Sequence, residues 1–273
     1  MSTAHDPRPP SARVEHLASA LDEAARLARP LPGGDTGLAD DGTDTAYAVQ
    51  AALVARRLAR GERATGVKLG FTSRAKMRQM GVSDLIHGRL TDAMAIPDGA
   101  VHPVDDLIHP RVEPEIAFLL GHALTADGDP AAAVAAVAPA LEVIDSRYDG
   151  FRFSLAEVVA DNTSAARYVL GPWRTPGDGH ELGNLGVLLE LDGRLAQSGS
   201  TAAILGHPLR ALAAAARLTG PLPAGTVVLA GAATAAVPLP PDTHVRATVA
   251  GLGSVRFTTA PADPHRDREG DPR

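Results

Sequence analysis

After residue 62 the chain consists of short apolar runs separated by glycine, and this pattern constrains the fold more than any other feature of the sequence. Short apolar runs that end at turn residues are typical of strands. We therefore predict a strand in each of the runs GVKLGFT, EIAFLLG, ALEVID, RYVLG, GVLLELDG, TVVLAG and HVRATVAGLGSVRFTT. Asp192-Gly193 predicts a two-residue hairpin turn, because a type I′ turn needs positive φ at both central residues. With only 3% aromatic residues, the core must consist of Leu, Val and Ala.

The N-terminal region shows helical periodicity instead. Apolar residues recur at helical spacing over 11–27 and again over about 45–58, so two helices open the predicted fold. The segment 31–44 is rich in Gly and Asp and is expected to form a surface loop, with a loop that covers a site as the alternative. Further helices are expected at 73–80, at 208–218 and, from a weaker pattern, at 130–138.

The same patterns divide the chain into four parts. The polar ends contain too little apolar area to become ordered, so 1–10 and 261–273 are expected to be disordered tails. Between them we expect a small helical region over 11–62 and a mostly β domain over 63–260. The predicted fold class is therefore α+β.

Charge and cysteine content exclude several classes of protein. The formal net charge is −6 and no run of Lys and Arg is long enough to follow a phosphate backbone, so no nucleic acid is expected as a partner. The absence of cysteine excludes disulfides, zinc fingers, iron–sulfur clusters and thiol nucleophiles. The first residues lack the apolar core of a signal peptide, and the apolar stretches are too short to span a membrane. We therefore expect a cytoplasmic protein without a membrane partner.

Several common catalytic motifs are also missing. The ten histidines form no compact ligand spacing such as H-x-x-x-H, and no G-x-S-x-G elbow is present. The glycines of 177–183 match a dinucleotide-binding motif only loosely and do not follow a strand. Any metal must therefore be held by oxygen or imidazole.

The most informative stretch is HPRVEPEIAF, in which Glu113 and Glu115 lie two residues apart at the start of an apolar strand. Residues at this spacing point to the same face of a strand. Two like charges on one face are costly unless a cation or a water-filled cleft compensates them. A hard cation such as Mg²⁺ or Mn²⁺ prefers carboxylate oxygens and would do so. The alternative is that both side chains face solvent at a sheet edge.

A second acidic element lies in ALEVIDSR, where Glu142 interrupts an apolar run and Asp145 ends it. A carboxylate inside a buried strand needs a positive partner. Glu142 would complete a three-carboxylate metal site with Glu113 and Glu115. In the alternative interpretation, Arg147 neutralises one of the two acids of this element in an ordinary ion pair.

Two further polar features are candidates for a site. Lys68, flanked by apolar residues and glycines, either extends its ammonium to the surface or directs it into a pocket toward an anion. Asp161, Asn162 and Ser164 lie between a helical and a strand segment. They are interpreted either as a cap and turn or as donors and acceptors for a ligand.

Taken together, GVKLGFTSRAKMRQMGV, GRLTDAM, HPRVEPEIAFLL, ALEVIDSRY, VADNTSAARYVLG and GLGSVRF resemble the 2-oxopent-4-enoate hydratase / 4-oxalocrotonate decarboxylase family of the fumarylacetoacetate hydrolase superfamily. The resemblance covers about residues 10–258. It implies a mixed β-roll core of the fumarylacetoacetate hydrolase type, a pocket lysine at Lys68, and Mg²⁺ or Mn²⁺ held by Glu113, Glu115 and Glu142. It also implies a homo-oligomer acting on 2-oxo or 2-hydroxydienoic acids from meta-cleavage of aromatic rings, and leaves open a complex with a related hydratase.

Within this family the sequence favours decarboxylation of 2-oxohex-3-enedioate over hydration of 2-hydroxypenta-2,4-dienoate. Where hydratases carry an acidic residue, this chain has Ile86, which cannot activate water, although Asp84 is close. GRLTDAM, HPRVEPE and the TAAVP segment also resemble the decarboxylase branch more closely. A non-catalytic binding partner is the remaining alternative.

The expected roles follow from this interpretation. Lys68, Asp161 and Asn162 are predicted to be catalytic, while Ser164, Arg111 and Arg147 are predicted to bind substrate. For Arg111 and Arg147, the candidate partners of the distal carboxylate, a structural salt bridge is the alternative.

Overall fold

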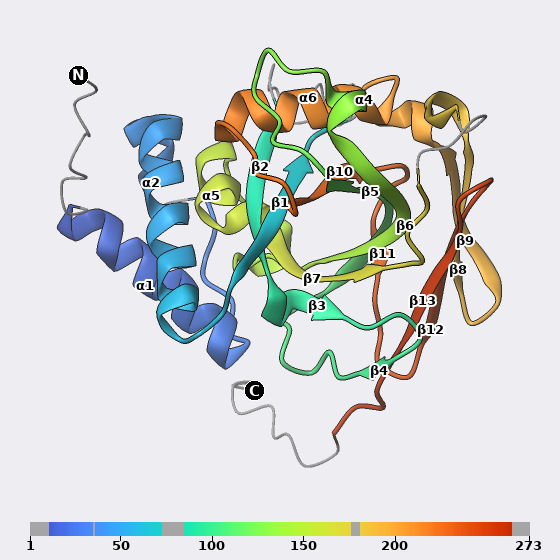
Figure 1. The fold of residues 1–273 in the computed structure, drawn as a ribbon. Coiled ribbons are helices and arrows are strands. Elements are labelled where there is room, and N and C mark those ends of the chain that lie inside the picture. The colour runs from blue at the N-terminus through green and yellow to red at the C-terminus, as the bar shows by residue number, and fades with distance from the viewer. Residues whose placement is uncertain (1–10, 35, 73–84, 176–180, 264–273) are drawn as a thin grey trace.

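The computed structural model describes residues 11–34, 36–72, 85–175 and 181–263 (Figure 1). The helix expected at 73–80 and the tail expected at 1–10 lie outside these residues, as does Asp84. Of the second expected tail only 261–263 are described, and they form no helix or strand.

Two helices open the fold, as predicted, and pack against each other beside the central sheet (Figure 1). α1 spans Ala12–Leu27, and the Ser11 side chain caps its first turn by accepting a backbone N–H. α2 spans Leu38–Ala59. Arg60, which follows α2, donates two hydrogen bonds of 2.7 and 2.8 Å to Asp22 of α1. This bidentate pair holds the C-terminal end of α2 against α1.

The expected loop over 31–44 is shorter than predicted, because α2 already begins at Leu38. Leu38 is fully buried in the apolar cluster between the N-terminal helices, and acidic residues in the first turn favour a helix start. Gly42, with φ of 83°, then kinks α2, so regular periodicity is visible only after it. Glu157 stabilises the remaining loop, because its carboxylate accepts a hydrogen bond of 3.1 Å from the N–H of Gly34.

A curved eight-stranded sheet forms the centre of the molecule (Figure 1). Its strands lie in the order β2-β1-β10-β5-β6-β7-β3, with β11 paired to β5. Their bounds are β1 Ala64–Gly70, β2 Ile86–Thr91, β3 Ala95–Ile96, β5 Arg111–Leu120, β6 Val134–Ile144, β7 Ala165–Leu170, β10 Val227–Ala232 and β11 Val237–Pro238. The pairs β1–β10 and β3–β7 are parallel and the others antiparallel, which makes the sheet mixed, as expected.

A second sheet of five strands packs against the first, in the order β4-β13-β12-β8-β9. Its strands are β4 Val101–His102, β8 Gly186–Leu191, β9 Arg194–Ser200, β12 His244–Val249 and β13 Gly253–Thr259. The hairpin predicted at Asp192-Gly193 joins β8 to β9, with φ of 49° and 72° at the two turn residues. The core between the two sheets is mostly Val, Leu and Ala, as the composition required.

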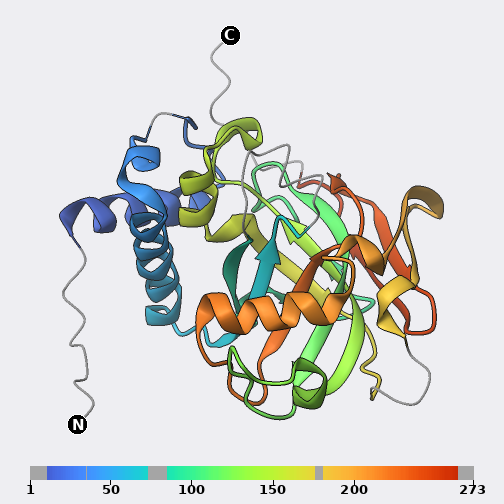
Figure 2. The same cartoon turned by 90° about the horizontal axis from the view of Figure 1, so that it is seen from above.

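Helices cover the outside of the curved sheet (Figure 2). α6 spans Pro208–Thr219, close to the predicted 208–218, and its buried Ala211 and Leu212 join the cluster that contains Phe118 of β5. α5 spans Leu155–Ala160 and packs on α2. Among the described residues, no helix is long and apolar enough to cross a membrane.

The helix predicted over 130–138 is wrong for most of its length. Only α4, Pro130–Ala133, is helical, and β6 begins at Val134. β6 pairs with β5 on one side and β7 on the other, and Val137 and Ala138 are fully buried. The hydrogen bonds and burial of a central strand therefore override the local helical preference of alanine.

Candidate metal centre

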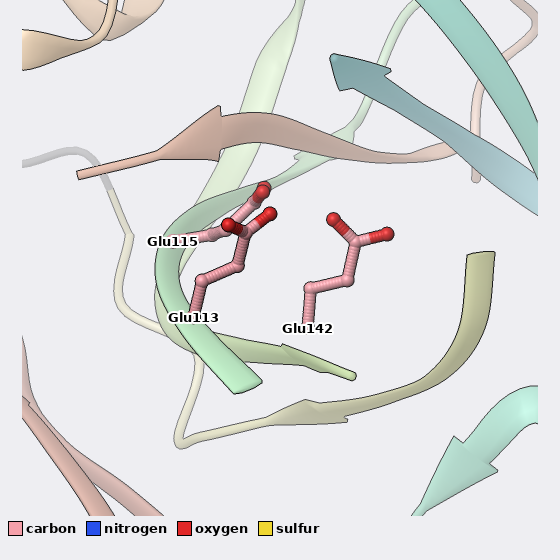
Figure 3. Close-up of side chains that lie close together, drawn as sticks. All are labelled: Glu113, Glu115 and Glu142. Atoms are coloured by element: carbon pink, nitrogen blue, oxygen red, sulfur yellow. The ribbon is translucent and has the colours of Figure 1, made fainter. Parts of the chain in front are cut away.

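Three glutamates meet on the two neighbouring strands β5 and β6 (Figure 3). Glu113 and Glu115 point to one face of β5, as their spacing predicted, and Glu142 of β6 lies directly opposite Glu113 in the strand register. One carboxylate oxygen from each lies within 4.8 Å of the others. The three residues are 5%, 1% and 0% exposed, so the alternative of solvent-facing edge carboxylates is excluded.

Burial makes this cluster electrostatically unfavourable on its own. Desolvation raises the pKa of Glu115 well above its usual value, and the charges of Glu142 and Glu113 raise it further. The pKa of Glu142 is also raised, chiefly by burial, although Lys68 opposes this shift. The backbone N–H of Gly231 donates to Oε2 of Glu115 at 2.8 Å and offsets part of the cost.

The donor set fits a hard divalent cation. Oε1 of Glu115 and Oε1 of Glu142 are buried and accept no hydrogen bond within the described part of the chain. Buried carboxylate oxygens without a donor are costly. Mg²⁺ and Mn²⁺ prefer such oxygen ligands and leave other coordination positions open for substrate. We therefore regard Glu113, Glu115 and Glu142 as the residues able to hold a metal ion.

Lys68 of β1 provides the positive charge beside this cluster. Its side chain is 3% exposed, so it does not extend to the surface. Nζ lies 2.9 Å from Oε2 of Glu142 and donates to the carbonyl oxygen of Thr163 at 3.1 Å. Burial acts to lower the pKa of Lys68, but the three glutamates outweigh it and the pKa lies above its usual value. Lys68 is therefore an ammonium that donates hydrogen bonds and not a neutral amine.

Asn162 and Ser164 lie in a short turn between α5 and β7, where the sequence predicted a polar connection. The Asn162 side chain is directed at β2: Oδ1 accepts the N–H of Arg89 at 2.7 Å and Nδ2 donates to the carbonyl of Arg89 at 2.9 Å. The hydroxyl of Ser164 is buried and makes no hydrogen bond within the described segments. The turn touches the charged cluster through Thr163, whose carbonyl accepts from Lys68.

Asp161 and Arg147 form a buried ion pair with each other. The guanidinium donates to the carboxylate through Nε, and the Arg147 backbone N–H donates to Oδ2 at 3.0 Å. Burial raises the pKa of Asp161 to about 6, even though Arg147 acts to lower it. The acid predicted to pair with Arg147 was Glu142 or Asp145. Asp145 instead accepts the backbone N–H groups of Ile108 and His109, each at 2.9 Å.

This arrangement is the structural salt bridge considered as the alternative for Arg147. In the described part of the chain, the Arg147 side chain donates to Asp161 and to the carbonyl of Ala165, and neither Arg147 nor Asp161 bonds to the three glutamates or to Lys68. The catalytic role of Asp161 and the substrate-binding role of Arg147 stay predictions.

Arg111 lies at the start of β5, two residues before Glu113 on the same face. Its side chain is exposed, and the guanidinium lies 4.7 Å from the ring centroid of Phe151. The same ring is 4.7 Å from that of His109. This cation–π contact leaves N–H groups of Arg111 available for an anion such as a distal carboxylate.

Ile86 is buried in β2 at 3% exposure, opposite Gly70 of β1. An acidic residue at this position could activate water, whereas isoleucine supplies only apolar surface. Asp84, the nearby acid, lies outside the described residues.

Sequence reasoning missed three backbone contributions to the site. Gly231 has φ of 104° at an irregularity in the β10–β5 pairing, and this aims its N–H at Glu115. The carbonyl of Thr163 binds Lys68, and Gly88 allows the 162–164 turn to approach β2. A glycine inside a strand pattern signals a bulge or a close backbone approach, and that signal was available at both glycines.

A cavity of about 250 Å³ lies away from this cluster, where α1 and α2 meet β7. Ion pairs line it, including Arg57–Glu62 at 2.9 Å and Arg60–Asp22 at 2.7 Å. None of its lining residues belongs to the glutamate cluster. Four of its five arginines are already ion-paired with carboxylates, so we place the chemistry at the glutamates.

Comparisons with known proteins cover most of this chain. Residues 57–260 match the family model described as fumarylacetoacetate hydrolase, C-terminal. A 4-oxalocrotonate decarboxylase from Pseudomonas sp is 48% identical over 256 residues, which cover 90% of this chain and 98% of the relative. A 2-keto-4-pentenoate hydratase from Paraburkholderia xenovorans (strain LB400) is 36% identical, over 89% of this chain and 93% of the relative. The solved structure of 4-oxalocrotonate decarboxylase from Pseudomonas putida G7, complexed with magnesium and adipate, has a TM-score of 0.86 and 36% identity, and the match covers 93% of this chain and 100% of that one.

Proposed function

This chain belongs to the fumarylacetoacetate hydrolase family, and within that family we propose that it is a divalent-metal-dependent decarboxylase of 2-oxohex-3-enedioate (4-oxalocrotonate), giving 2-hydroxypenta-2,4-dienoate and CO₂. One observation carries the assignment: a buried cluster of Glu113, Glu115 and Glu142 beside Lys68, in a chain that is 48% identical to a 4-oxalocrotonate decarboxylase along almost its whole length. The hydratases are less similar, at 36% for the example above.

The reaction follows from electron flow in the substrate. When the C5–C6 bond breaks, C6 leaves as CO₂. The two electrons of that bond stay on the rest of the substrate and pass through the C3=C4 double bond to the C2 oxygen. Negative charge therefore develops on that oxygen in the transition state, and protonation of the oxygen gives the 2-hydroxydiene. Groups that stabilise charge at the C2 oxygen accelerate the step, because they interact more strongly with the transition state than with the substrate. Mg²⁺ or Mn²⁺, when held by the three glutamates, would supply Lewis-acid stabilisation of this charge.

Lys68 is the residue of this chain best placed to support the same charge. Its ammonium has three N–H donors, of which Glu142 and Thr163 engage two. The third can donate to the substrate near its C2 oxygen or its C1 carboxylate. Because the pKa of Lys68 is raised, Nζ carries its proton at neutral pH and can provide both charge and a hydrogen bond.

Arg111 and Ser164 are proposed to bind the substrate. The exposed Arg111 attracts the C6 carboxylate through its guanidinium N–H groups. A tight ion pair with this carboxylate would stabilise the substrate more than the transition state, so a loose contact suits the reaction. The buried hydroxyl of Ser164 bonds to none of the described residues and can hydrogen-bond the substrate chain. The expected homo-oligomer and a complex with a related hydratase belong to the same proposal.

The choice between decarboxylase and hydratase is tested by incubating the protein with Mg²⁺ and each substrate in turn. We expect CO₂ release from 2-oxohex-3-enedioate and formation of the pentadienoate, both followed by mass spectrometry. Buried Ile86 supports this outcome because it cannot act as a base toward water. Addition of water to 2-hydroxypenta-2,4-dienoate without CO₂ release from the other substrate would identify a hydratase. No reaction with either would favour a binding role.

Metal removal is expected to lower decarboxylation by at least about a thousandfold, because the stabilising charge at the C2 oxygen is lost. The protein is treated with EDTA, desalted and assayed by CO₂ release. Mg²⁺ or Mn²⁺ added back should restore the rate, whereas Ca²⁺, with its longer and more flexible coordination, should restore less. Full activity after the metal has been removed would contradict the proposed centre.

A further inference from the structure

The turn between α5 and β7 has an unusual backbone. Asn162, Thr163 and Ser164 have φ of 51°, 55° and 56°, so three consecutive residues other than glycine lie in the left-handed region. This conformation is unfavourable for L-residues, and asparagine tolerates it better than threonine or serine. Backbone strain of this kind persists only where surrounding contacts enforce it, and it concentrates at functional sites.

We propose that this turn is a positioning element for Lys68, and that Asn162 is its anchor. In this arrangement Asn162 fixes the turn to β2, the turn presents the carbonyl of Thr163, and that carbonyl holds Nζ of Lys68 beside Glu142. The inference rests on the proposed function in one respect, namely that Lys68 takes part in the reaction. It changes the predicted role of Asn162 from a catalytic residue to a positioning residue.

The anchoring contacts hold the turn from two sides. The amide group of Asn162 makes both a donor and an acceptor contact with the backbone of Arg89, much as a neighbouring strand would. The hydroxyl of Thr163 donates to the carbonyl of His87 at 2.7 Å, also on β2. On the other side, the carbonyl of Ser164 accepts the N–H of Asp145 at 2.9 Å. These contacts leave the Thr163 carbonyl little freedom to move.

Gly88 makes this close packing possible. It is the register partner of Lys68 in the β1–β2 pair. A Cβ atom at Gly88 would lie 2.5 Å from the carbonyl oxygen of Asn162, a distance that real Cβ contacts do not reach. Only glycine therefore lets the turn lie against β2 next to Lys68. A connection that served only to join α5 to β7 would need neither the strained residues nor this glycine.

The test is a double-mutant cycle between the turn and Lys68. Asn162→Gly removes both anchoring hydrogen bonds and fits the left-handed conformation without added strain. We expect kcat for CO₂ release to fall about 10- to 100-fold, because a displaced ammonium no longer matches the developing charge. The calorimetric Mg²⁺ affinity should stay within about twofold, since the three glutamates are untouched. In the Lys68→Met background the same change should lower kcat by less than about twofold.

Gly88→Ala provides a second variant in case Asn162→Gly does not fold. It pushes the turn from β2 without removing any functional group, and we expect the same dependence on Lys68. The matched control is Gly186→Ala on β8, where an added Cβ meets nothing within 4 Å. This control should leave kcat unchanged. An unchanged kcat in both turn variants, or an equal loss with and without Lys68, would overturn the proposal.

The two proposals fail in different ways. A wild-type protein that releases no CO₂ would refute the proposed function. The same cycle would then be measured by urea unfolding of the full chain, where a turn that holds Lys68 gives non-additive changes and an independent turn gives additive ones.

Discussion

Glu115→Gln is expected to lower the rate of CO₂ release by about a thousandfold or more and to weaken Mg²⁺ binding strongly. Glutamine keeps the size of the side chain but removes one of the three negative charges that would hold the cation. It also replaces one carboxylate oxygen with an amide N–H₂ group, which cannot bind a metal. Steady-state kinetics and calorimetric Mg²⁺ titration measure the two losses separately.

In the metal-free protein, the same Glu115→Gln substitution should not lower stability. Glu115 lies buried beside two other carboxylates, and this raises its pKa well above the usual value. Removing its charge relieves the repulsion, so the urea midpoint of the metal-free variant should be equal to or higher than that of the wild type. Glu190→Gln on β8, in the five-stranded sheet, is the matched control. It should change neither the rate of CO₂ release nor the urea midpoint. Normal turnover by Glu115→Gln would show that this carboxylate does not serve the reaction.

The part of the site that sequence could predict depends on local geometry. Glu113 and Glu115 share a face because side chains alternate along a strand, and this holds wherever the strand lies. Placing Glu142 opposite Glu113 requires the β5–β6 register, which the residues alone do not specify. The sequence made Glu142 a candidate third ligand because it interrupts an apolar run, and the family resemblance implied the same residue. The partner of Arg147 was missed for the same reason, because Asp161 reaches it only through the path of the chain after β6.

The elements of the fold also divide into those specified by local sequence and those specified by contacts between distant segments. Glycine-bounded apolar runs predicted the strands, and the Asp192-Gly193 turn was predicted correctly because its φ angles are a local property. The helix expected over 130–138 is wrong because pairing with both β5 and β7 outweighs the helical preference of alanine. The parallel pairing of β1 with β10 joins segments far apart in the chain, and no local pattern specifies it.

The strained turn at 162–164 could not be predicted from sequence either. Asparagine, threonine and serine each favour turns, which is what the sequence indicated. Their shared left-handed conformation arises from contacts with β2 and with Asp145, both distant in sequence. The site therefore consists of a locally encoded pair of carboxylates and a non-local frame that orients Lys68.

Lys68→Met is expected to lower kcat for CO₂ release by about 100- to 1,000-fold, the range found when one group that stabilises an oxyanion is removed. Methionine fills a similar volume but carries neither charge nor N–H donors. Mg²⁺ should bind at least as tightly as to the wild type, because an ammonium 2.9 Å from Glu142 competes with the metal for that carboxylate. A lower kcat with undiminished metal affinity separates this outcome from a general loss of structure.

The stability of Lys68→Met should also report the loss of the ion pair between Lys68 and Glu142. Without metal, Lys68→Met leaves the buried Glu142 without its cation, and such a loss is destabilising. The urea midpoint of the metal-free variant should therefore fall, and saturating Mg²⁺ should restore more stability to the variant than it adds to the wild type. Lys68→Arg keeps the charge but brings a larger planar group into a site with 3% exposure, so we expect it to restore stability better than kcat. Wild-type turnover in Lys68→Met would show that Lys68 only neutralises the glutamates. Loss of folding that Mg²⁺ does not reverse would show that its role lies in packing, because the metal can replace its charge but not its contacts.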